Sequence, residues 1–353
     1  MATRKKKETG DPKRSETRSG TPWSGKRYLV TGGAGFIGSH LSERLLAEGH
    51  EVVVMDDLST GRIENVSHLE DDPRFDCVIE SVSNEALLQN IIDDVDAVFH
   101  LAAGVGVMSV VKSPVHTIEA TLYSTEMVLN CASSAGDKKV LITSSSEVYG
   151  KGVRVPFREE DDMLFGPTTK SRWSYGCSKA IDEFLALAYH KEMKLPVVIA
   201  RLFNTVGPRQ VGDFGMVLPR FVAQALKGGP ITVFGDGKQT RCFVHVLDTV
   251  DALVKLMDCE AAVGQVVNVG SDCEVSIDDL AERVRRRVNP EAQVVHVPYE
   301  EAYEEGFEDL RRRVPDLTRA RHLIGLRPTR SLDEIVDEVA ETARERQRKL
   351  DTL

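Results

Sequence analysis

The sequence contains few cysteines, and none of them stand where a metal site would need them. The six cysteines are scattered, without a Cys-x-x-Cys pair or a cluster with histidine, so neither a zinc site nor a disulfide framework is expected. No hydrophobic run approaches the roughly 18 residues that cross a bilayer, and the N-terminus lacks the apolar core of a signal peptide. We therefore expect a soluble protein of the reducing cytoplasm that binds no metal and no membrane.

Apolar residues are also scarce at the start of the chain. Residues 1–24 are rich in Lys, Arg, Thr, Ser, Gly and Pro, which is typical of disordered segments. The chain as a whole carries a net charge of −10, so its folded part is acidic and no nucleic-acid partner is expected. We predict a disordered basic tail over residues 1–24.

Strand-like and helix-like segments alternate after the tail, which predicts an α/β fold of the Rossmann type with a doubly wound parallel sheet. The run Val52-Val53-Val54 does not alternate with polar residues, as expected of strands covered by helices on both faces. The predicted division is a main domain over 25–205, to which 240–270 returns, and a smaller α/β substrate-binding region over 206–239 and 271–345. Strands are expected at 28–31, 51–55, 75–79, 97–101, 139–143 and 197–200, and helices at 85–92, 117–135 and 174–192, besides one ending at 46.

A glycine-rich turn joins the first strand to the first helix. Gly32 permits a tight turn, Gly35 lets backbone N–H groups approach a pyrophosphate, and Gly38 lets the helix lie close to the strand. Asp56 ends the next strand, where its carboxylate accepts hydrogen bonds from a ribose diol and disfavours a 2′-phosphate. The combination predicts that the main domain binds NAD, although glycines and an aspartate that only shape a turn are the alternative.

Tyr175 and Lys179 stand four residues apart on a predicted helix and so share a face. A nearby ammonium lowers the pKa of a tyrosine, which otherwise lies near 10, toward the range useful for taking a proton from a sugar hydroxyl. Alone, this spacing is more typical of a surface pair. Ser145 and Ser146, however, stand at the end of a buried strand, where open α/β sheets bind ligands.

These segments together resemble the extended short-chain dehydrogenases, a family with a Gly-x-x-Gly-x-x-Gly turn, a Ser or Thr ending the fifth strand, and Tyr-x-x-x-Lys. The resemblance covers residues 26–340 and implies that Tyr175 and NAD oxidise C4 of a nucleotide-linked sugar. Two positions depart from the family pattern, since Ser81 stands where relatives have an adenine-contacting aspartate and His116 where decarboxylases have a lysine. The predicted cofactor contacts are Gly32, Gly35, Phe36, Ile37, Gly38, Asp56, Asp57, Gly61, Leu101, Ala102, Ala103, Tyr175 and Lys179.

Glu147 distinguishes between the reactions of this family. The segment Ser-Ser-Glu-Val-Tyr-Gly at 145–150 resembles the Thr-Ser-Glu-Val-Tyr-Gly of UDP-glucuronate decarboxylases and the Thr-Ser-Glu-Leu-Tyr-Gly of GDP-mannose 4,6-dehydratases, whereas 4-epimerases have a small or apolar residue there. The resemblance implies that Glu147 removes the C5 proton in a dehydratase, or positions the uronate and manages C5 protonation in a decarboxylase. Its predicted catalytic partners are Tyr175, Lys179, Ser145 and Ser146.

The segment 306–318 resembles the Arg-Lys-Pro-Asp-Ile segment of uronate decarboxylases, which implies that Arg313 reaches the active site. Arginine forms two parallel bonds to a carboxylate or phosphate, and similar segments bind diphosphate in epimerases. Asn204, Arg209 and Arg241 are interpreted as further substrate-binding residues, with a plain surface role for Arg209 as the alternative.

The leading hypothesis is therefore a UDP-glucuronate decarboxylase that oxidises C4, releases carbon dioxide, and reduces C4 again or releases the 4-keto pentose. A nucleotide-hexose 4-epimerase and a 4,6-dehydratase remain alternatives, and a non-catalytic NAD-binding regulatory protein is a distant one. The resemblance also implies a homodimer that pairs the helices near 117–135 and 174–192.

Overall fold

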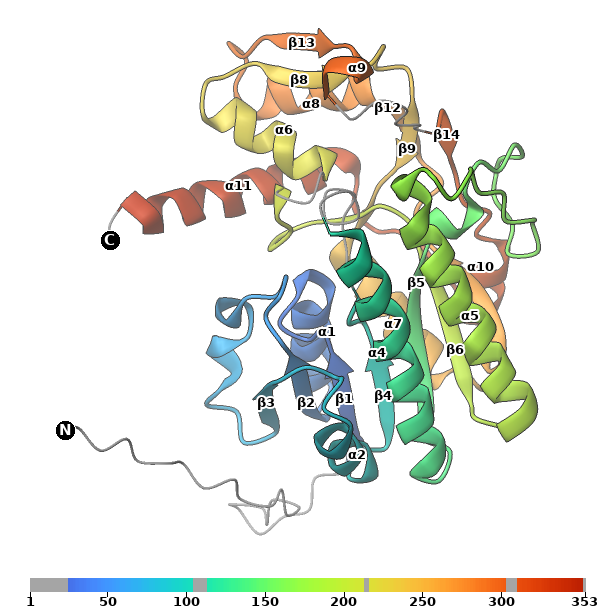
Figure 1. Cartoon of the computed structure of the whole chain (residues 1–353). Coiled ribbons are helices and arrows are strands. Elements are labelled where there is room, and N and C mark those ends of the chain that lie inside the picture. The colour runs from blue at the N-terminus through green and yellow to red at the C-terminus, as the bar shows by residue number, and fades with distance from the viewer. Residues whose placement is uncertain (1–24, 104–112, 213–215, 303–309, 352–353) are drawn as a thin grey trace, which may run out of the picture.

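A parallel sheet of seven strands forms the centre of the protein (Figure 1). The computed structural model describes residues 25–103, 113–212, 216–302 and 310–351. The predicted tail at 1–24 and the part of the C-terminal motif at 306–309 lie outside these ranges. In spatial order the strands are β11 (Gln265–Val269), β6 (Val197–Leu202), β5 (Lys139–Ser145), β4 (Ala97–His100), β1 (Arg27–Thr31), β2 (Glu51–Asp56) and β3 (Phe75–Ile79).

Helices cover both faces of this sheet. Successive side chains of a strand point to opposite faces, so Val52 and Val54 join one hydrophobic core while Val53 joins the other. Both faces are buried, which explains why the valine run lacks polar residues. The expected α/β fold with a doubly wound parallel sheet is thereby confirmed. One face carries α1 (Phe36–Ala47), α7 (Val246–Asp258) and α10 (Thr318–Ile324), and the other carries α2 (Glu85–Asp93), α4 (Pro114–Ser134) and α5 (Ser174–Met193).

A smaller region with its own hydrophobic core lies above the carboxyl ends of the strands (Figure 1). Its core includes Phe221, Ile231 and Val284, all without exposed surface. Short strand pairs connect this region to the sheet below. Its elements and the connecting strands are α6 (Val217–Leu226), β8 (Ile231–Phe234), α8 (Ile277–Val288), β13 (Val294–Val297), α9 (Tyr299–Ala302), α11 (Leu332–Asp351), β7 (Thr205–Val206), β10 (Val244–His245), β9 (Thr240–Cys242), β12 (Glu274–Ser276) and β14 (Arg312–Arg313).

The chain passes between the two regions more than once. Both α7 and β11, from 240–270, pack in the sheet layers. Helix α10 also packs there, through the buried Ala320, although it comes from the 271–345 stretch that was assigned to the substrate-binding region. The domain boundaries given above therefore remain predictions.

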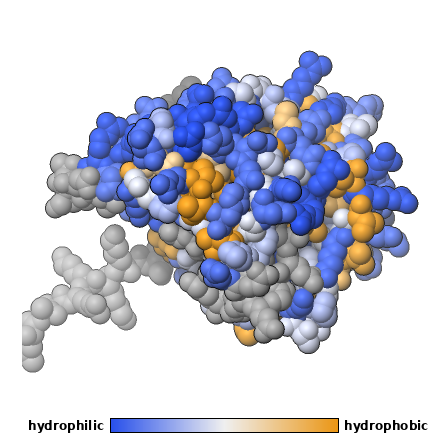
Figure 2. Space-filling view, turned by 90° about the horizontal axis from the view of Figure 1, so that it is seen from above, coloured by the Kyte–Doolittle hydropathy of each residue, from blue (hydrophilic) through white to orange (hydrophobic). Residues whose placement is uncertain are grey.

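Among the described residues no helix combines the length and the apolar character that crossing a membrane requires. The face seen from above is predominantly hydrophilic, with hydrophobic patches that are small and separate (Figure 2).

Candidate active site

A cavity of about 900 Å³ opens at the carboxyl ends of the sheet strands. Strand β1 lies between β2 and β4, so the strand order reverses here: β2 and β3 follow on one side of β1, and β4, β5 and β6 on the other. Ligands of open α/β sheets bind at such a switch in strand order. The lining residues come from both the sheet and the smaller region, which places the cavity between them.

The glycine-rich turn forms one wall of this cavity, and its geometry requires glycine. Gly32 has a φ of +68°, and a Cβ at this position would lie 2.9 Å from the backbone nitrogen of Ala102. At Gly38 a Cβ would lie 2.2 Å from the carbonyl oxygen of Gly32. Helix α1 begins at Phe36, directly after the turn, so its first N–H groups and its positive dipole end favour an anion there. The turn therefore fits the pyrophosphate of a dinucleotide.

Asp56 lies at the end of β2 and lines the same cavity. Its two oxygens accept hydrogen bonds from the backbone nitrogens of Leu58, at 2.8 Å, and Ala34, at 3.0 Å. Burial raises the pKa of Asp56, and these two donors oppose the rise. Each carboxylate oxygen accepts more than one hydrogen bond, so the carboxylate retains the capacity to bind a ribose diol.

Most of the predicted cofactor contacts meet in this cavity. Gly61 is not among the lining residues, but it packs against Asp56, because a Cβ there would lie 2.7 Å from Oδ1. Lys179 is also absent from the lining. The predicted cofactor contacts that do line the cavity are Gly32, Gly35, Phe36, Ile37, Gly38, Asp56, Asp57, Leu101, Ala102, Ala103 and Tyr175.

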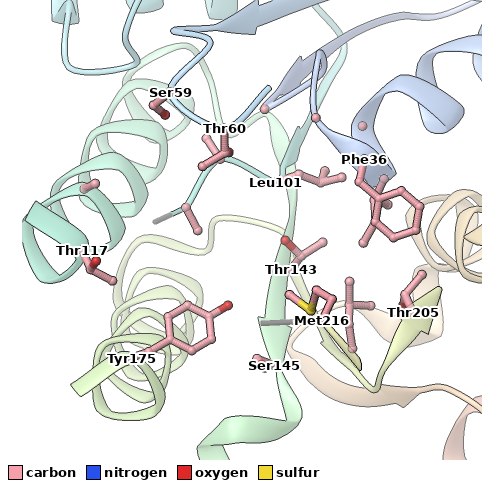
Figure 3. Close-up of a pocket in the computed structure, with 18 of the residues that line it drawn as sticks. Phe36, Ser59, Thr60, Leu101, Thr117, Thr143, Ser145, Tyr175, Thr205 and Met216 are labelled. Atoms are coloured by element: carbon pink, nitrogen blue, oxygen red, sulfur yellow. The ribbon is translucent and has the colours of Figure 1, made fainter. Parts of the chain in front are cut away.

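Tyr175 comes from α5 and points its hydroxyl into the cavity, toward the end of β5 (Figure 3). Ser145 ends β5 and hydrogen-bonds to Tyr175, while its Oγ also accepts from the backbone nitrogen of Glu147 at 3.2 Å. Burial raises the pKa of Tyr175, and the nearby charges of Glu147 and Asp182 raise it further.

Lys179 has a carboxylate partner that the Tyr-x-x-x-Lys spacing did not predict. Its ammonium is 2.8 Å from Oδ2 of Asp182, three residues further along α5. Both side chains are buried, at 2% and 0% exposure. The carboxylate offsets the positive charge that a tyrosine four residues away would otherwise feel.

Glu147 is held between two arginines. Its Oε1 is 2.7 Å from Nη1 of Arg313, and its Oε2 is 2.6 Å from Nη1 of Arg172. Burial alone would raise the pKa of Glu147, but the two guanidinium groups lower it to about 2. The Arg172–Glu147–Arg313 cluster therefore carries one excess positive charge beside Tyr175.

The predicted substrate residues also lie around the cavity. Strands β9 and β14 pair in parallel with Arg241 opposite Arg313, so residues that are far apart in sequence direct two cations to one wall. Asn204 donates to the carbonyl of Cys242 at 3.2 Å. Arg209 forms an ion pair with Glu43 of α1 at 2.5 Å, so its positive charge is already partly balanced. All four predicted substrate residues line the cavity: Asn204, Arg209, Arg241 and Arg313.

Sequence reasoning missed two residues of this site, Arg172 and Asp182. Arg172 lies in a short 3-10 helix (η4, Ser171–Trp173) just before α5, and an arginine three residues before the tyrosine was its only signal. Asp182 carried a clearer signal, because it lies three residues after Lys179 and therefore on the same helical face. The two positions that depart from the family pattern, Ser81 and His116, both line the cavity.

Comparisons with known proteins identify the family of this chain. The family model described as GDP-mannose 4,6 dehydratase matches residues 29–339. A UDP-N-acetyl-alpha-D-glucosaminuronate decarboxylase of Bacillus cytotoxicus is 40% identical over 321 residues, which cover 91% of this chain and 98% of that protein. UDP-glucuronic acid decarboxylase 2 of Arabidopsis thaliana is 40% identical over 87% of this chain and 66% of its own length.

Solved structures with the same fold contain the cofactor expected here. A UDP-glucuronic acid 4-epimerase of Bacillus cereus, in complex with UDP-glucuronic acid and NAD, superposes with a TM-score of 0.80 at 29% identity, covering 90% of this chain and 99% of that one. A dTDP-glucose 4,6-dehydratase of Streptomyces venezuelae with bound NAD gives a TM-score of 0.81 at 28% identity, covering 90% and 97%.

Proposed function

Because the chain belongs to the nucleotide-sugar epimerase and dehydratase family that the GDP-mannose 4,6-dehydratase model describes, we propose that it is an NAD-dependent decarboxylase of a UDP-linked uronic acid. The observation that carries this proposal is the Arg172–Glu147–Arg313 cluster beside Tyr175. Its excess positive charge suits a substrate that brings a carboxylate to this wall, since a buried charge is stabilised by an opposite one.

NAD is the cofactor of this enzyme. Bound at the glycine turn, NAD would supply the hydride acceptor for the oxidation of C4 and the hydride donor for its reduction. At Gly32 and Gly38 a side chain would collide with the backbone, so the glycines keep the turn tight and its N–H groups directed at the pyrophosphate, and Asp56 is proposed to accept from the adenosine ribose.

Tyr175 is proposed to take the proton of the C4 hydroxyl as the hydride leaves C4. Its hydroxyl points into the cavity beside Ser145 and Thr143 (Figure 3), and Ser145 orients it. The oxidised sugar has its ketone β to the C6 carboxylate, so the C5–C6 bond breaks with its electrons moving toward the ketone. Carbon dioxide leaves, C5 gains a proton from solvent, and Tyr175 returns its proton to the C4 oxygen as C4 is reduced.

The state of Glu147 favours decarboxylation over dehydration. A dehydratase needs a base that removes the C5 proton, but a carboxylate whose pKa is about 2 is a weak proton acceptor. A decarboxylase removes no C5 proton. Glu147 is instead proposed to orient Arg313. The Nε atom of Arg313 has no hydrogen-bond partner among the described residues, and we propose that Arg313 binds the C6 carboxylate.

The sugar is proposed to be glucuronate or its 2-acetamido derivative, because relatives acting on each are 40% identical. Arg241 and Asn204 are proposed to hold the diphosphate and sugar. The test is to incubate the purified protein with UDP-glucuronate and with UDP-N-acetylglucosaminuronate, and to measure released carbon dioxide and identify the products by NMR. Release from either supports the proposal. If neither releases carbon dioxide while UDP-glucose and UDP-galactose interconvert, the protein is an epimerase.

A homodimer is proposed to form through α4 and α5, which lie side by side (Figure 1). Four apolar side chains of this helix pair are at least half exposed: Val115, Tyr123, Ile181 and Phe184. Burying such a surface against a second copy removes it from water. A cytoplasmic location is also proposed, since all six cysteines are free.

Light scattering tests the dimer. Phe184→Glu places a charge on this surface and is expected to give monomers, whereas Val153→Glu, at another exposed apolar position, is expected to leave the dimer intact. A monomeric wild-type protein would contradict the proposal.

A further inference from the structure

Asp182 is a buried carboxylate that the proposed mechanism does not use. It has no exposed surface, and its Oδ2 is 2.8 Å from the ammonium of Lys179. Its Oδ1 has no hydrogen-bond partner among the described residues. Burying a carboxylate with one oxygen unbonded costs free energy that a neutral side chain of similar size would not. This cost raises the question of what Asp182 contributes.

Tyr175, Lys179 and Asp182 lie on one face of α5, at spacings of four and three residues. The phenol that moves the substrate proton, the cation beside it and the anion that balances this cation therefore form one row. We propose, on the basis of the proposed function, that Asp182 is a positioning residue that fixes the Lys179 ammonium and offsets its charge, and so sets the pH at which Tyr175 exchanges its proton.

The surrounding charged groups agree with this assignment. Glu183, the neighbour of Asp182, is already paired with Arg201 of β6 at 2.7 Å, so it does not compete for Lys179. On β4, burial, together with the charge of Lys179, lowers the pKa of His100 to about 3, so this imidazole is neutral. The hydroxyl of Thr125 on α4 lies near Asp182 and favours its ionised form, but it carries no charge. Glu147, whose charge also raises the pKa of Tyr175, is paired with Arg172 and Arg313.

The expected consequence concerns both halves of the reaction. Tyr175 must give up its proton before C4 is oxidised and must hold that proton again when C4 is reduced. A lysine without a partner would stabilise the phenolate, which assists oxidation but opposes re-reduction. By offsetting Lys179, Asp182 favours the protonated phenol and so the return of the 4-ketone to the alcohol.

The experiment replaces Asp182 by Asn, which keeps the shape and removes the charge. In the NAD-bound protein with isotope-labelled tyrosine, the ζ-carbon resonance of Tyr175, assigned with Tyr175→Phe, reports the ionisation of the phenol. Asp182→Asn is expected to lower its midpoint by about one pH unit, a tenfold gain in phenolate at a given pH. The acid limb of kcat/KM should move with it, and more reduced cofactor should accumulate during turnover. Glu192→Gln, which changes an exposed carboxylate on the same helix, should alter none of these.

An unchanged midpoint in Asp182→Asn, with activity lowered equally at every pH, would mean that Asp182 is only structural and would overturn the inference. If Asp182→Asn does not fold, Asp182→Thr carries the same test, because it is also neutral and similar in size. The tyrosine resonance is measured without turnover, so this experiment tests the role of Asp182 independently of the proposed decarboxylase activity. A shifted midpoint without carbon dioxide release refutes only the decarboxylase, and carbon dioxide release with an unshifted midpoint refutes only the role of Asp182.

Discussion

Glu147 and Arg313 are 166 residues apart in sequence, yet their side chains form an ion pair of 2.7 Å at the wall of the cavity. The pair joins the short 3-10 helix that follows β5 (Ser146–Tyr149) to β14, in the connecting strands above the sheet. The geometry of this cavity wall therefore depends on how the sheet and the connecting strands pack against each other.

Glu147→Gln and Arg313→Ala are expected to slow the turnover of the UDP-uronate at least about tenfold, equivalent to about 1.4 kcal/mol in the barrier. Each removes a charge-assisted contact near C5 and C6 and leaves the glycine turn intact. NAD binding, measured by fluorescence titration, should be unchanged. Wild-type rates of carbon dioxide release in both variants would remove the cluster from the mechanism.

The stability of the protein in acid should reflect Glu147. Its pKa is about 2 in the folded protein against 4.5 as the ordinary value, so the folded state binds the proton less readily than the unfolded state. The stabilisation that ionised Glu147 gives the folded state is complete above about pH 4.5 and is lost as the pH falls toward 2. It amounts to about 3 kcal/mol at most. The free energy of unfolding, measured with urea, should therefore differ less between wild type and Glu147→Gln at about pH 3 than at about pH 6. A constant difference would show that Glu147 is not held by its arginines.

Arg172→Ala should raise the KM for the UDP-uronate. Glu147 would then be paired with one arginine instead of two, and the cluster would lose the positive charge proposed to attract the substrate carboxylate. Arg172→Lys should recover only part of the loss, since a lysine provides the charge without the planar fork of donors. Arg154→Ala, which changes an exposed arginine on the neighbouring loop, is the matched control. Equal KM values in all three variants would exclude Arg172 from substrate binding.

Asp56→Arg should shift the cofactor preference from NAD toward NADP, because it removes an acceptor for the ribose diol and adds a partner for a 2′-phosphate. Asp56→Asn serves as the control, since it retains an oxygen acceptor and adds no cation. Dissociation constants for both cofactors provide the measurement. If neither constant changes in Asp56→Arg, Asp56 does not contact the cofactor.

The sheet could be predicted from sequence because its signals are local. The valine run of β2 and the turn at Gly32 each specify their own conformation within a few residues, and the family resemblance is confirmed by the match over residues 29–339. The ends of the elements were less certain. Strand β5, for example, continues to Ser145 rather than ending at Thr143, which carries its hydroxyls further into the cavity.

Side-chain partners could not be predicted in the same way, because they depend on contacts between distant segments. The family motif placed Arg313 near the active site, but only the pairing of β14 with β9 sets it opposite Arg241. Similarly, Lys179 was expected to act on Tyr175, but burial beside Asp182 gives its charge another partner. The helical spacing gives the face on which a residue lies and leaves open which neighbour it binds.

The late position of β11 in the chain has a consequence for biosynthesis. Strand β6 ends at Leu202, but β11, which pairs with it, begins only at Gln265, after α6 and β8. Until β11 is made, β6 pairs with β5 on one side only, and its other edge is open; such edges invite association with other chains. The intervening segment must leave the ribosome before this edge is covered. Chains that end before residue 265 should therefore aggregate, even though they contain the complete glycine turn and the Tyr-x-x-x-Lys helix.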